Sequence, residues 1–309
     1  MLRNIFLLVF RKIAQPFRNL PIRIKIGKLY PLEFVYNLLV KRIVKPNDII
    51  EVMGHKMFLD SKDALRLSIY GIYEPFETEL LKKLIKKNNI IIDVGANIGY
   101  YTLIATKCAG KNGKVYAFEP DPTNFAILKK NANINGYNNI ILTQKAISNK
   151  TGKAKLYLCT KNTADHKIYD DGTNRKFIEI DSIRLDDFFK NFNEEINLIK
   201  IDTQGAEGHV LQGMISLIER NKNIKIIIEF WPSGLQKDGF NPKDLLMSLK
   251  KHGFNLYIIN EKSERLEPVN IDSLLKQYVS EARGHPSLLC IRSTKAIYCY
   301  INERQAGRL

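Results

Sequence analysis

Four apolar segments of this chain end in an acidic residue, and the first of these acids opens a glycine-spaced loop. A run of three isoleucines ends in Asp93, and Gly95, Asn97 and Gly99 follow before an amphipathic segment. Strand, tight turn and helix in this order form the first unit of a doubly wound α/β domain that binds a nucleotide-like cofactor. A nicotinamide dinucleotide site would need G-x-G-x-x-G against a pyrophosphate, whereas this loop reads D-x-G-x-x-x-G. A loop opened by a carboxylate suits a cation, and S-adenosylmethionine carries an ammonium and a sulfonium and no phosphate. The loop therefore predicts a methyl-donor site.

Glu119 ends the next apolar segment, 24 residues after Gly95. In dinucleotide sites an acid about 20 residues beyond the glycine loop accepts hydrogen bonds from a ribose diol. By itself Glu119 could be a solvated turn acid. Coupled to the glycine loop, it is predicted to bind the cofactor ribose.

Asp202 ends a third apolar segment, near the expected position of the transferred methyl group. Lys200 lies inside that segment, where an unpaired charge is costly, so it must be paired or face a cavity. Glu207 falls in the first turn of the following helix, where a carboxylate complements the helix dipole. A structural role therefore explains Glu207 as well as a functional one, while Asp202 is harder to explain without a function.

Glu229 ends another buried run, and Trp231, the only tryptophan, follows it closely. Asp202 and Glu229 end strands that are predicted to be neighbours. The two carboxylates could hold a hard cation such as Mg²⁺, or could serve as general base and orienting group, and the sequence leaves both open. Trp231 could stack on a sugar or on adenine, or pack in the core. His166, in a polar inserted segment, is a candidate substrate contact.

The elements that must position these residues alternate between strand and helix. Strands are expected at 90–94, 115–118, 140–143, 198–202, 224–229, 256–259 and 288–291, with an antiparallel insertion at 153–158 and 177–180. Helices are expected from Pro75 and at 123–135, 183–192, 206–220 and 242–252. The pattern predicts an α/β fold with one doubly wound, mostly parallel, seven-stranded Rossmann-like sheet. A small β segment is expected near 49–59.

The charge of +16 is concentrated at the two ends of the 309-residue chain. Residues 1–50 hold ten Lys or Arg against two Asp or Glu, and residues 276–309 hold six against two. A basic end suggests an anionic partner, although a lysine-rich composition of the source proteome would give the same count. We expect a basic N-terminal extension over 1–70, a catalytic domain over 71–293 and a tail over 294–309.

The N-terminal extension is predicted to be helical, with candidate helices near 2–13 and 32–44. The first is basic and amphipathic, so it could lie in a membrane interface or pack on the domain, and it is too short to span a bilayer, which takes about 20 residues. The four cysteines are scattered, which favours a reducing compartment. These observations predict a cytoplasmic protein with a possible peripheral membrane contact.

Six motifs in order make the chain resemble the FkbM-type family of S-adenosylmethionine-dependent methyltransferases, from about Gly71 to Ile291. The motifs are Tyr73-Glu74-Pro75, Asp93-Val94-Gly95-Ala96-Asn97-Ile98-Gly99, Phe118-Glu119-Pro120, Ala146-Ile147-Ser148, Leu185-Asp186-Asp187-Phe188 and Lys200-Ile201-Asp202-Thr203-Gln204-Gly205-Ala206-Glu207. The family usually has an acid where this chain has Gln204.

The resemblance implies O-methylation of a hydroxyl on a sugar, a glycan, a lipid-linked saccharide or another small molecule. Carried over by position, it implies that Glu119 binds ribose, that Ala146 lies near adenine, that Asp202 lies near the methyl group and that Glu74 helps to close the pocket. It places the methionine part of the cofactor against Asp93, Gly95, Asn97 and Gly99.

Because a sugar hydroxyl is a poor acid, a base or a metal should help to remove its proton. We predict Asp202 as this base, assisted by Glu229 or Glu207. An RNA methyltransferase is the first alternative, but enzymes that methylate base amino groups usually carry an N/D-P-P-Y/F-type loop here, so a nucleic-acid partner is disfavoured. A non-catalytic binding protein is the second, and the joint presence of Asp93, Glu119 and Asp202 argues against it.

Overall fold

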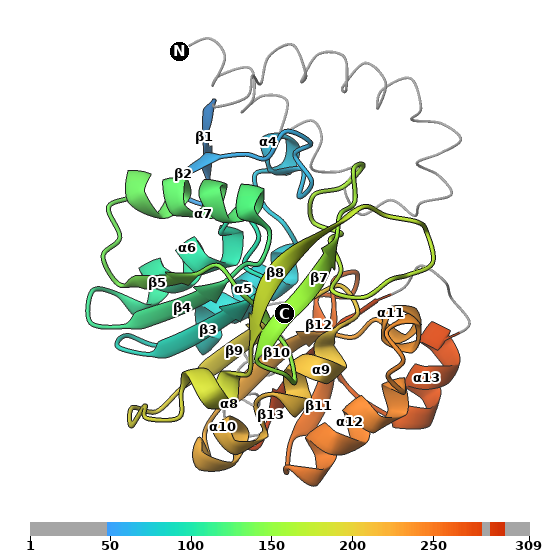
Figure 1. Cartoon of the computed structure of the whole chain (residues 1–309). Helices are drawn as coiled ribbons and strands as arrows, with labels where there is room; N and C mark the ends of the chain where they lie inside the picture. Colours follow the sequence, from blue (N-terminus) through green and yellow to red (C-terminus); the bar gives the residue numbers. More distant parts are fainter. Residues whose placement is uncertain (1–47, 280–284, 294–309) are drawn as a thin grey trace.

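A mixed eight-stranded sheet organises the part of the chain that the structure describes, residues 48–279 and 285–293 of a computed structural model (Figure 1). Its order is β12-β11-β13-β10-β9-β3-β4-β5. From β5 to β10 neighbouring strands run parallel, whereas β13 is antiparallel to both β10 and β11. The strands are β3 (Ile90–Val94), β4 (Lys114–Phe118), β5 (Ile140–Thr143), β9 (Leu198–Ile201), β10 (Lys225–Glu229), β11 (Asn255–Asn260), β12 (Arg265–Pro268) and β13 (Ser287–Ile291).

The predicted α/β class and Rossmann-like sheet are confirmed, but the expected number of seven strands is wrong by one. The additional strand is β12, which pairs antiparallel with β11 at the sheet edge. It has four residues, and only Leu266 among them is buried. A strand this short with one buried position shows no readable alternation of apolar and polar residues.

Helices cover both faces of the sheet because the central strands are apolar on both sides. Within β3, Ile90 and Ile92 join the core formed with α8–α13, whereas Ile91 joins the core formed with α4–α6. The helices are α4 (Leu67–Tyr70), α5 (Pro75–Leu84), α6 (Tyr100–Ala109), α7 (Pro122–Ile134), α8 (Leu185–Phe188), α9 (Glu207–Gln212), α10 (Ile215–Arg220), α11 (Pro232–Lys237), α12 (Pro242–Lys251) and α13 (Ile271–Val279).

The single helix expected over 206–220 is two helices, α9 and α10, which meet around Gly213. A Cβ atom at Gly213 would lie 2.1 Å from the carbonyl oxygen of Ser148. The chain therefore breaks where its backbone meets that of the β6–β7 connection, a contact that local periodicity does not reveal.

A three-stranded sheet of β6 (Ala146–Ile147), β7 (Gly152–Tyr157) and β8 (Phe177–Ile183) lies in front of the main sheet in the view of Figure 1. Strands β7 and β8 pair antiparallel, as predicted for the insertion. The connection between them returns to the main domain, since the Asn124 amide donates a hydrogen bond to the carbonyl oxygen of Thr163 (2.9 Å). This connection forms one wall of the site described below.

The expected β segment near 49–59 is the hairpin of β1 (Ile49–Val52) and β2 (His55–Phe58). Its residues Ile50 and Met57 are buried in the core shared with α5 and α6. The side chain of Asn131 on α7 bonds both the N–H and the carbonyl of Phe58, at 2.7 and 3.0 Å. The helices expected near 2–13 and 32–44 and the tail at 294–309 lie outside the described residues.

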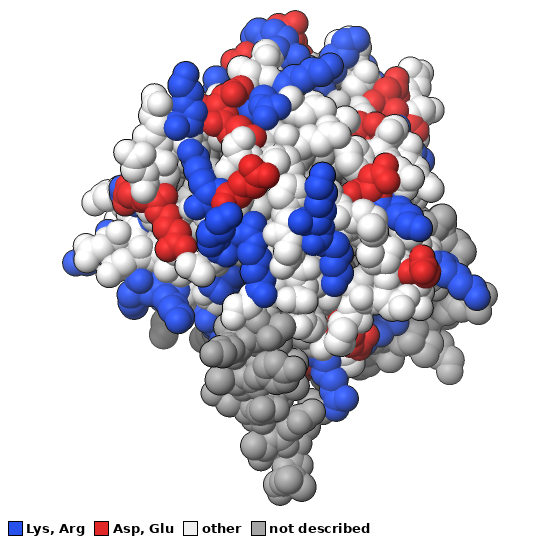
Figure 2. Space-filling model, turned by 90° about the horizontal axis from the view of Figure 1, so that it is seen from below, with Lys and Arg blue, Asp and Glu red and all other residues white. Residues whose placement is uncertain are grey.

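Figure 2 shows Lys and Arg side chains interspersed with Asp and Glu over the face seen from below. Residues 1–47 hold ten Lys or Arg and one Glu, so most of the positive excess lies outside this described surface. Within residues 48–279 and 285–293, none of the helices combines the length and the apolar character that crossing a membrane would require.

Candidate active site

A cleft opens at the carboxyl ends of β3, β4 and β9, where ligands bind in open α/β sheets. The empty space of this cleft is about 900 Å³, a volume that includes its open mouth. Its walls come from the loops after these three strands, from β6 and from the β7–β8 connection.

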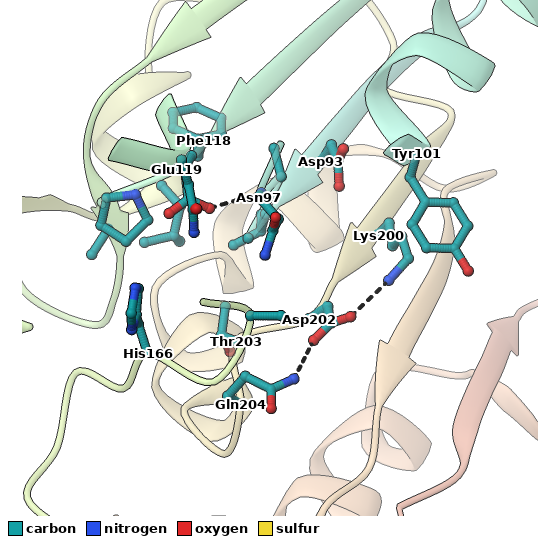
Figure 3. Close-up of a pocket in the computed structure, with 18 of the residues that line it drawn as sticks. Asp93, Asn97, Tyr101, Phe118, Glu119, His166, Lys200, Asp202, Thr203 and Gln204 are labelled. Carbon is teal, nitrogen blue, oxygen red and sulfur yellow. Dashed lines mark hydrogen bonds and ion pairs between the residues drawn. The ribbon is translucent and has the colours of Figure 1, made fainter. Parts of the chain in front are cut away.

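Gly95 places the loop after β3 in close contact with the turn after β9. Its φ is +81°, and a Cβ atom there would lie 1.9 Å from the carbonyl oxygen of Asp202. Only glycine satisfies both the left-handed backbone and this contact. Two residues later, Asn97 (φ 51°) donates its backbone N–H to Glu119 Oε2 at 2.7 Å. The loop thus holds Glu119 and Asp202 in one cleft (Figure 3).

Glu119 is buried between two backbone donors, the N–H of Asn97 and the N–H of Asp121, at 2.7 and 2.9 Å. Burial raises the pKa of its carboxyl to about 8, despite these hydrogen bonds. Each carboxylate oxygen keeps a lone pair for a further donor. The position suits a pair of hydroxyl groups.

The cleft wall beyond Glu119 is apolar. Ala146 is buried in this wall, with Phe118 and Leu156 also lining it. His166 lines the same end, on the Glu119 side of the cleft in Figure 3. Its Nδ1 accepts the backbone N–H of Cys159 at 3.0 Å, and burial lowers the pKa of its imidazole. A neutral histidine and an apolar wall suit a flat heterocycle.

The opposite end of the cleft holds buried charges. Lys200 Nζ lies 3.3 Å from Asp202 Oδ2, 3.5 Å from Glu77 Oε1 and 4.3 Å from the centre of the Tyr101 ring. Burial alone would lower the pKa of Lys200, but the neighbouring carboxylates, Asp202 and Glu77 first among them, raise it above its usual range. Lys200 is therefore paired, as its place in an apolar strand requires.

Asp93 accepts a hydrogen bond from the Thr102 hydroxyl at 2.5 Å and lines the cleft below the glycine loop. Burial raises the pKa of Asp93, and the nearby Lys200 opposes this. A cationic ligand group in the cleft would add to the effect of Lys200 and favour the ionised form.

Asp202 stays ionised in this cluster. Burial would raise the pKa of Asp202, but Lys200 and a hydrogen bond from Gln204 outweigh burial, so the pKa lies below its usual range. The Gln204 Nε2 atom donates to Asp202 Oδ1 at 2.8 Å and to Glu229 Oε2 at 3.2 Å. Asp202 and Glu229 thus share one donor, as their predicted neighbouring strands suggested.

The Gln204 side-chain amide also determines whether Asp202 and Glu229 can hold Mg²⁺ in this arrangement. An amide nitrogen donates hydrogen bonds and does not ligate Mg²⁺, and here it lies between the Asp202 and Glu229 carboxylates. Among residues 48–279 and 285–293, no group of three or more His, Cys, Asp or Glu side chains is arranged to hold a metal ion. Asp202 and Glu229 therefore do not fit a preformed metal site in this arrangement.

Glu74, Glu207 and Glu229 do not line the cleft themselves. Glu207 is fully buried behind the turn, where its Oε1 accepts from Thr203 N and Oγ1 (both 3.0 Å) and from Gly205 N (3.1 Å). Burial raises its pKa to about 8. Glu74, at the start of α5, accepts from the Tyr101 hydroxyl at 2.9 Å. Both therefore contact residues that line the cleft, Glu74 through Tyr101 and Glu207 through Thr203.

The chain matches a known protein family over most of the residues that form this cleft. The family described as "Methyltransferase FkbM domain" matches residues 93–256, which is more than half of the chain. The chain belongs to the FkbM methyltransferase family. It is therefore an S-adenosylmethionine-dependent methyltransferase, and its cofactor is S-adenosylmethionine.

Similar curated proteins include "Methyltransferase 1" of Beauveria bassiana, 25% identical over 41% of this chain and 59% of that protein. "Methyltransferase sdnD" of Sordaria araneosa is 25% identical over 56% of this chain and 83% of its own length. "Hexuronic acid methyltransferase AglP" of Haloferax volcanii is 27% identical over 56% of this chain and 66% of its own. The chain thus spans less than two thirds of the first and third of these relatives.

Among solved structures, an S-adenosylmethionine-dependent O-methyltransferase from Thermotoga maritima aligns with 84% of this chain and 81% of its own, at 14% identity and a TM-score of 0.39. Aeropyrum pernix fibrillarin with bound S-adenosyl-L-methionine aligns with 78% of this chain and 84% of its own, at 13% identity and a TM-score of 0.40.

The sequence did not single out two further features, one in the cleft and one outside the residues that line it. Tyr73 lines the cleft and packs edge-on to Tyr100 and Tyr101, with ring centroids 6.2 and 6.4 Å apart. The signal for these rings was present, since Tyr73 opens the first motif and the other two follow Gly99 directly. His285, whose Nδ1 lies 2.8 Å from Glu229 Oε1, gave no such signal.

Trp231 packs next to the pair formed by His285 and Glu229. Its ring lies 4.7 Å from Lys167 Nζ and 5.8 Å from the His285 ring, and a Cβ atom at Gly234 would come within 2.6 Å of it. It is not among the residues that line the cleft. These contacts favour packing over stacking on a ligand.

Proposed function

We propose that this FkbM-family methyltransferase transfers the methyl group of S-adenosylmethionine to a hydroxyl of a sugar, in a glycan or a lipid-linked saccharide. The observation that carries the proposal is the position of Asp202. Its ionised carboxylate lies in the cleft beside the glycine loop, where it can accept a hydrogen bond from a hydroxyl. The name of the similar AglP, a hexuronic acid methyltransferase, supports a sugar as the acceptor.

The proposal assigns a part of the cofactor to each region of the cleft. The ribose hydroxyls donate to Glu119, and the adenine lies against the apolar wall that contains Ala146. The methionine part lies along the loop from Gly95 to Gly99, with its ammonium near Asp93. Asn97 supports this arrangement through the backbone hydrogen bond that holds Glu119. The sulfonium then faces Asp202.

The reaction requires mainly an in-line approach of the acceptor oxygen to the methyl carbon. The oxygen–carbon bond forms as the carbon–sulfur bond breaks, and the electron pair of that bond stays on sulfur. The hydroxyl proton passes to the Asp202 carboxylate and from there to water. Asp202 orients the hydroxyl through a hydrogen bond, and Tyr73 and Tyr101 surround this end of the cleft.

Release of S-adenosylhomocysteine tests the proposal. The full chain is incubated with S-adenosylmethionine and, separately, with methyl β-D-glucuronide, methyl β-D-glucoside or a short RNA. We expect release with a glycoside and none with RNA. Asp202→Asn should lower turnover by at least about 100-fold, as for other residues that act on the transferred proton or its oxygen, while the cofactor still binds.

Two results would contradict this proposal. Full turnover by the Asp202→Asn variant would remove Asp202 from the reaction. Methylation of RNA alone would replace the sugar by a nucleic acid as the acceptor.

We also propose that the basic segment before residue 48 contacts an anionic membrane surface, which a vesicle sedimentation assay of the full chain tests.

A further inference from the structure

One side-chain amide joins two carboxylates at the end of the cleft that holds Lys200. Gln204 Nε2 lies 2.8 Å from Asp202 Oδ1, as Figure 3 shows, and 3.2 Å from Glu229 Oε2. An amide nitrogen carries two hydrogens, so it can donate one to each carboxylate. Asp202 and Gln204 line the cleft themselves, whereas Glu229 does not.

The backbone of the turn that contains Gln204 is held without this side chain. Glu207 Oε1 accepts from the N–H groups of Thr203 and Gly205, at 3.0 and 3.1 Å. The Tyr169 hydroxyl, on the β7–β8 connection, donates to the carbonyl oxygen of Gln204 at 2.9 Å. The hydrogen bonds of the Gln204 side chain therefore act on the two carboxylates and are not required to hold the turn.

The amide holds one oxygen of Asp202, and Lys200 holds the other. Lys200 Nζ lies 3.3 Å from Asp202 Oδ2. A carboxylate bonded at both oxygens from two elements has a fixed plane, and each oxygen keeps a lone pair for a further donor. The Asp202 side chain is 24% exposed, so these lone pairs are open to a ligand in the cleft.

Glu229 places a second carboxylate beside Asp202. Its side chain is 7% exposed, and burial together with the charge of Asp202 raises its pKa. Two neighbouring carboxylates repel each other unless a donor lies between them or one of them takes up a proton. The Gln204 amide supplies this donor without adding a charge. Glu229 Oε1 lies 2.8 Å from His285 Nδ1, so both carboxylates are held at both oxygens.

We propose that Gln204 is a positioning residue of the methyl transfer, whose neutral amide bonds Asp202 and Glu229 at once and fixes the Asp202 carboxylate for the acceptor hydroxyl. This rests on the proposed function, in which Asp202 orients the hydroxyl and accepts its proton. A rotated Asp202 carboxylate would move the hydroxyl out of line with the methyl carbon and the sulfur, and such misplacement is costly in rate.

Two substitutions separate this role from support of the turn. Gln204→Met keeps the length of the side chain and removes both donor hydrogens. Gln204→Glu keeps the shape as well, but it has a donor only while the introduced carboxyl is protonated. Both substitutions retain a Cβ atom, so the left-handed backbone at this position, with a φ of 55°, costs all three side chains about the same.

The experiment measures kcat of the full chain against pH, with EDTA, saturating S-adenosylmethionine and the glycoside that is methylated. Gln204→Met should lower kcat by about 10–100-fold at every pH, the range for losing a hydrogen bond to a charged group. Gln204→Glu should lose at least as much at high pH, where a third carboxylate faces the other two. Its kcat should recover toward the wild-type value as the pH falls and the introduced carboxyl takes up a proton.

The other charged or titrating groups around the amide are the same in all of these proteins. The ratio of each variant's kcat to that of the wild type at the same pH therefore isolates the introduced carboxyl. These groups are Lys200 on β9, His285 before β13, Glu207 on α9, Tyr169 on the β7–β8 connection, Glu74 before α5 and Asp93 on β3.

Gln212→Met and Gln212→Glu are the matched controls. Gln212 lies at the end of α9, outside the residues that line the cleft, and its Oε1 accepts from Asn149 Nδ2 at 2.8 Å. Both control variants should keep the wild-type kcat at each pH. Calorimetry with S-adenosylhomocysteine checks folding, and the Kd of the Gln204 variants should stay within about threefold of wild type, since the contact acts on turnover.

The outcomes decide the role of Gln204. Wild-type kcat in Gln204→Met would overturn the proposal, and so would equal losses in Gln204→Met and Gln204→Glu at every pH. If Gln204→Met does not bind the cofactor, the pH profile of Gln204→Glu decides alone.

If neither glycoside is methylated, the proposed function has failed separately, and a carbon NMR titration of the Asp202 carboxyl tests the contact. Burial would raise the pKa of Asp202, while Lys200 and the hydrogen bond from Gln204 lower it. A higher pKa of Asp202 in Gln204→Met than in the wild type would support the proposal. An unchanged pKa would contradict it.

Discussion

Single residues fix the geometry of the cleft, and Gly95 does so through backbone alone. Its left-handed φ lets the loop turn between Asp93 and Asn97, and its missing side chain lets the chain touch the carbonyl of Asp202. The sequence showed that a glycine was needed in this loop. It could not show that the contact partner is the turn after β9, because that contact spans more than 100 residues.

Gly95→Ala should lower both stability and cofactor affinity. An alanine in the left-handed region costs about 1–2 kcal/mol, and here the clash with the Asp202 carbonyl adds to it. Gly136→Ala is the control, because Gly136 has a φ of +68° and a Cβ atom added there would meet no atom within 4 Å. Urea unfolding and calorimetry with S-adenosylhomocysteine measure the two effects. Equal losses in the two variants would show that the contact with Asp202 is unimportant.

Glu119→Gln should separate cofactor binding from stability. Burial raises the pKa of Glu119 from 4.5 to about 8, so the folded chain keeps a proton that the unfolded chain releases in this window. Stability therefore falls as pH rises from about 4.5 to about 8, and the glutamine variant should lose one proton's share of this slope. Cofactor affinity should fall by about 10–100-fold through the weakened ribose hydrogen bonds. Urea unfolding of the wild type and the variant at both ends of this pH window measures the effect. An equal change of unfolding free energy with pH in the two proteins would contradict it.

At the scale of the elements, the turn between β9 and α9 lines the cleft with Asp202 and Thr203, and Glu207 supports it from the side away from the cleft. Glu207 accepts three hydrogen bonds from Thr203 and Gly205 through one oxygen, while its other oxygen is buried without a hydrogen-bond partner in the described structure. The raised pKa fits a neutral carboxyl there. These contacts favour a structural role for Glu207, in which it stabilises the turn. They favour this role over the assisting catalytic role that the sequence predicted.

Glu207→Gln should keep the turn, and Glu207→Ala should not. The amide oxygen can accept the same three hydrogen bonds, so kcat should stay within about threefold of wild type. Alanine leaves buried donors unpaired, which costs about 1–3 kcal/mol for each group. Thermal unfolding and turnover are measured on both variants. A glutamine variant with native stability and no turnover would restore a catalytic role for Glu207.

The motifs predicted β3, β4, β9 and β10 well because each of these four apolar runs leads to an acid. Asp93, Glu119 and Asp202 were expected at strand ends, and the structure places them in one cleft. Strand direction and order were not available from the pattern. His285 precedes a strand that inserts antiparallel beside β10, so it meets Glu229 only through strand pairing that periodicity does not encode.

At the scale of the whole molecule, five parallel strands bring their carboxyl ends to one edge of the sheet, and the cleft lies at the ends of three of them, β3, β4 and β9. A ligand that fills it contacts the loops after three strands and the β7–β8 connection at once. Binding should therefore stabilise the described fold as a unit.

Saturation with S-adenosylhomocysteine should raise the melting temperature. A ligand at 100 times its Kd adds about 2.7 kcal/mol of stability. That corresponds to a rise of roughly 5–10 °C for a domain of this size. NADH at the same concentration should cause no rise, since the loop lacks the dinucleotide pattern. An equal rise with NADH in differential scanning fluorimetry would contradict the cofactor assignment.

The position of the bound cofactor tests the central claim most directly. The measurement is a crystal structure of the full chain with S-adenosylhomocysteine. We predict the ribose hydroxyls within about 3 Å of the Glu119 carboxylate and the sulfur facing Asp202. A cofactor bound with its sulfur away from Asp202, or with its ribose away from Glu119, would contradict both the proposed site and the reaction built on it.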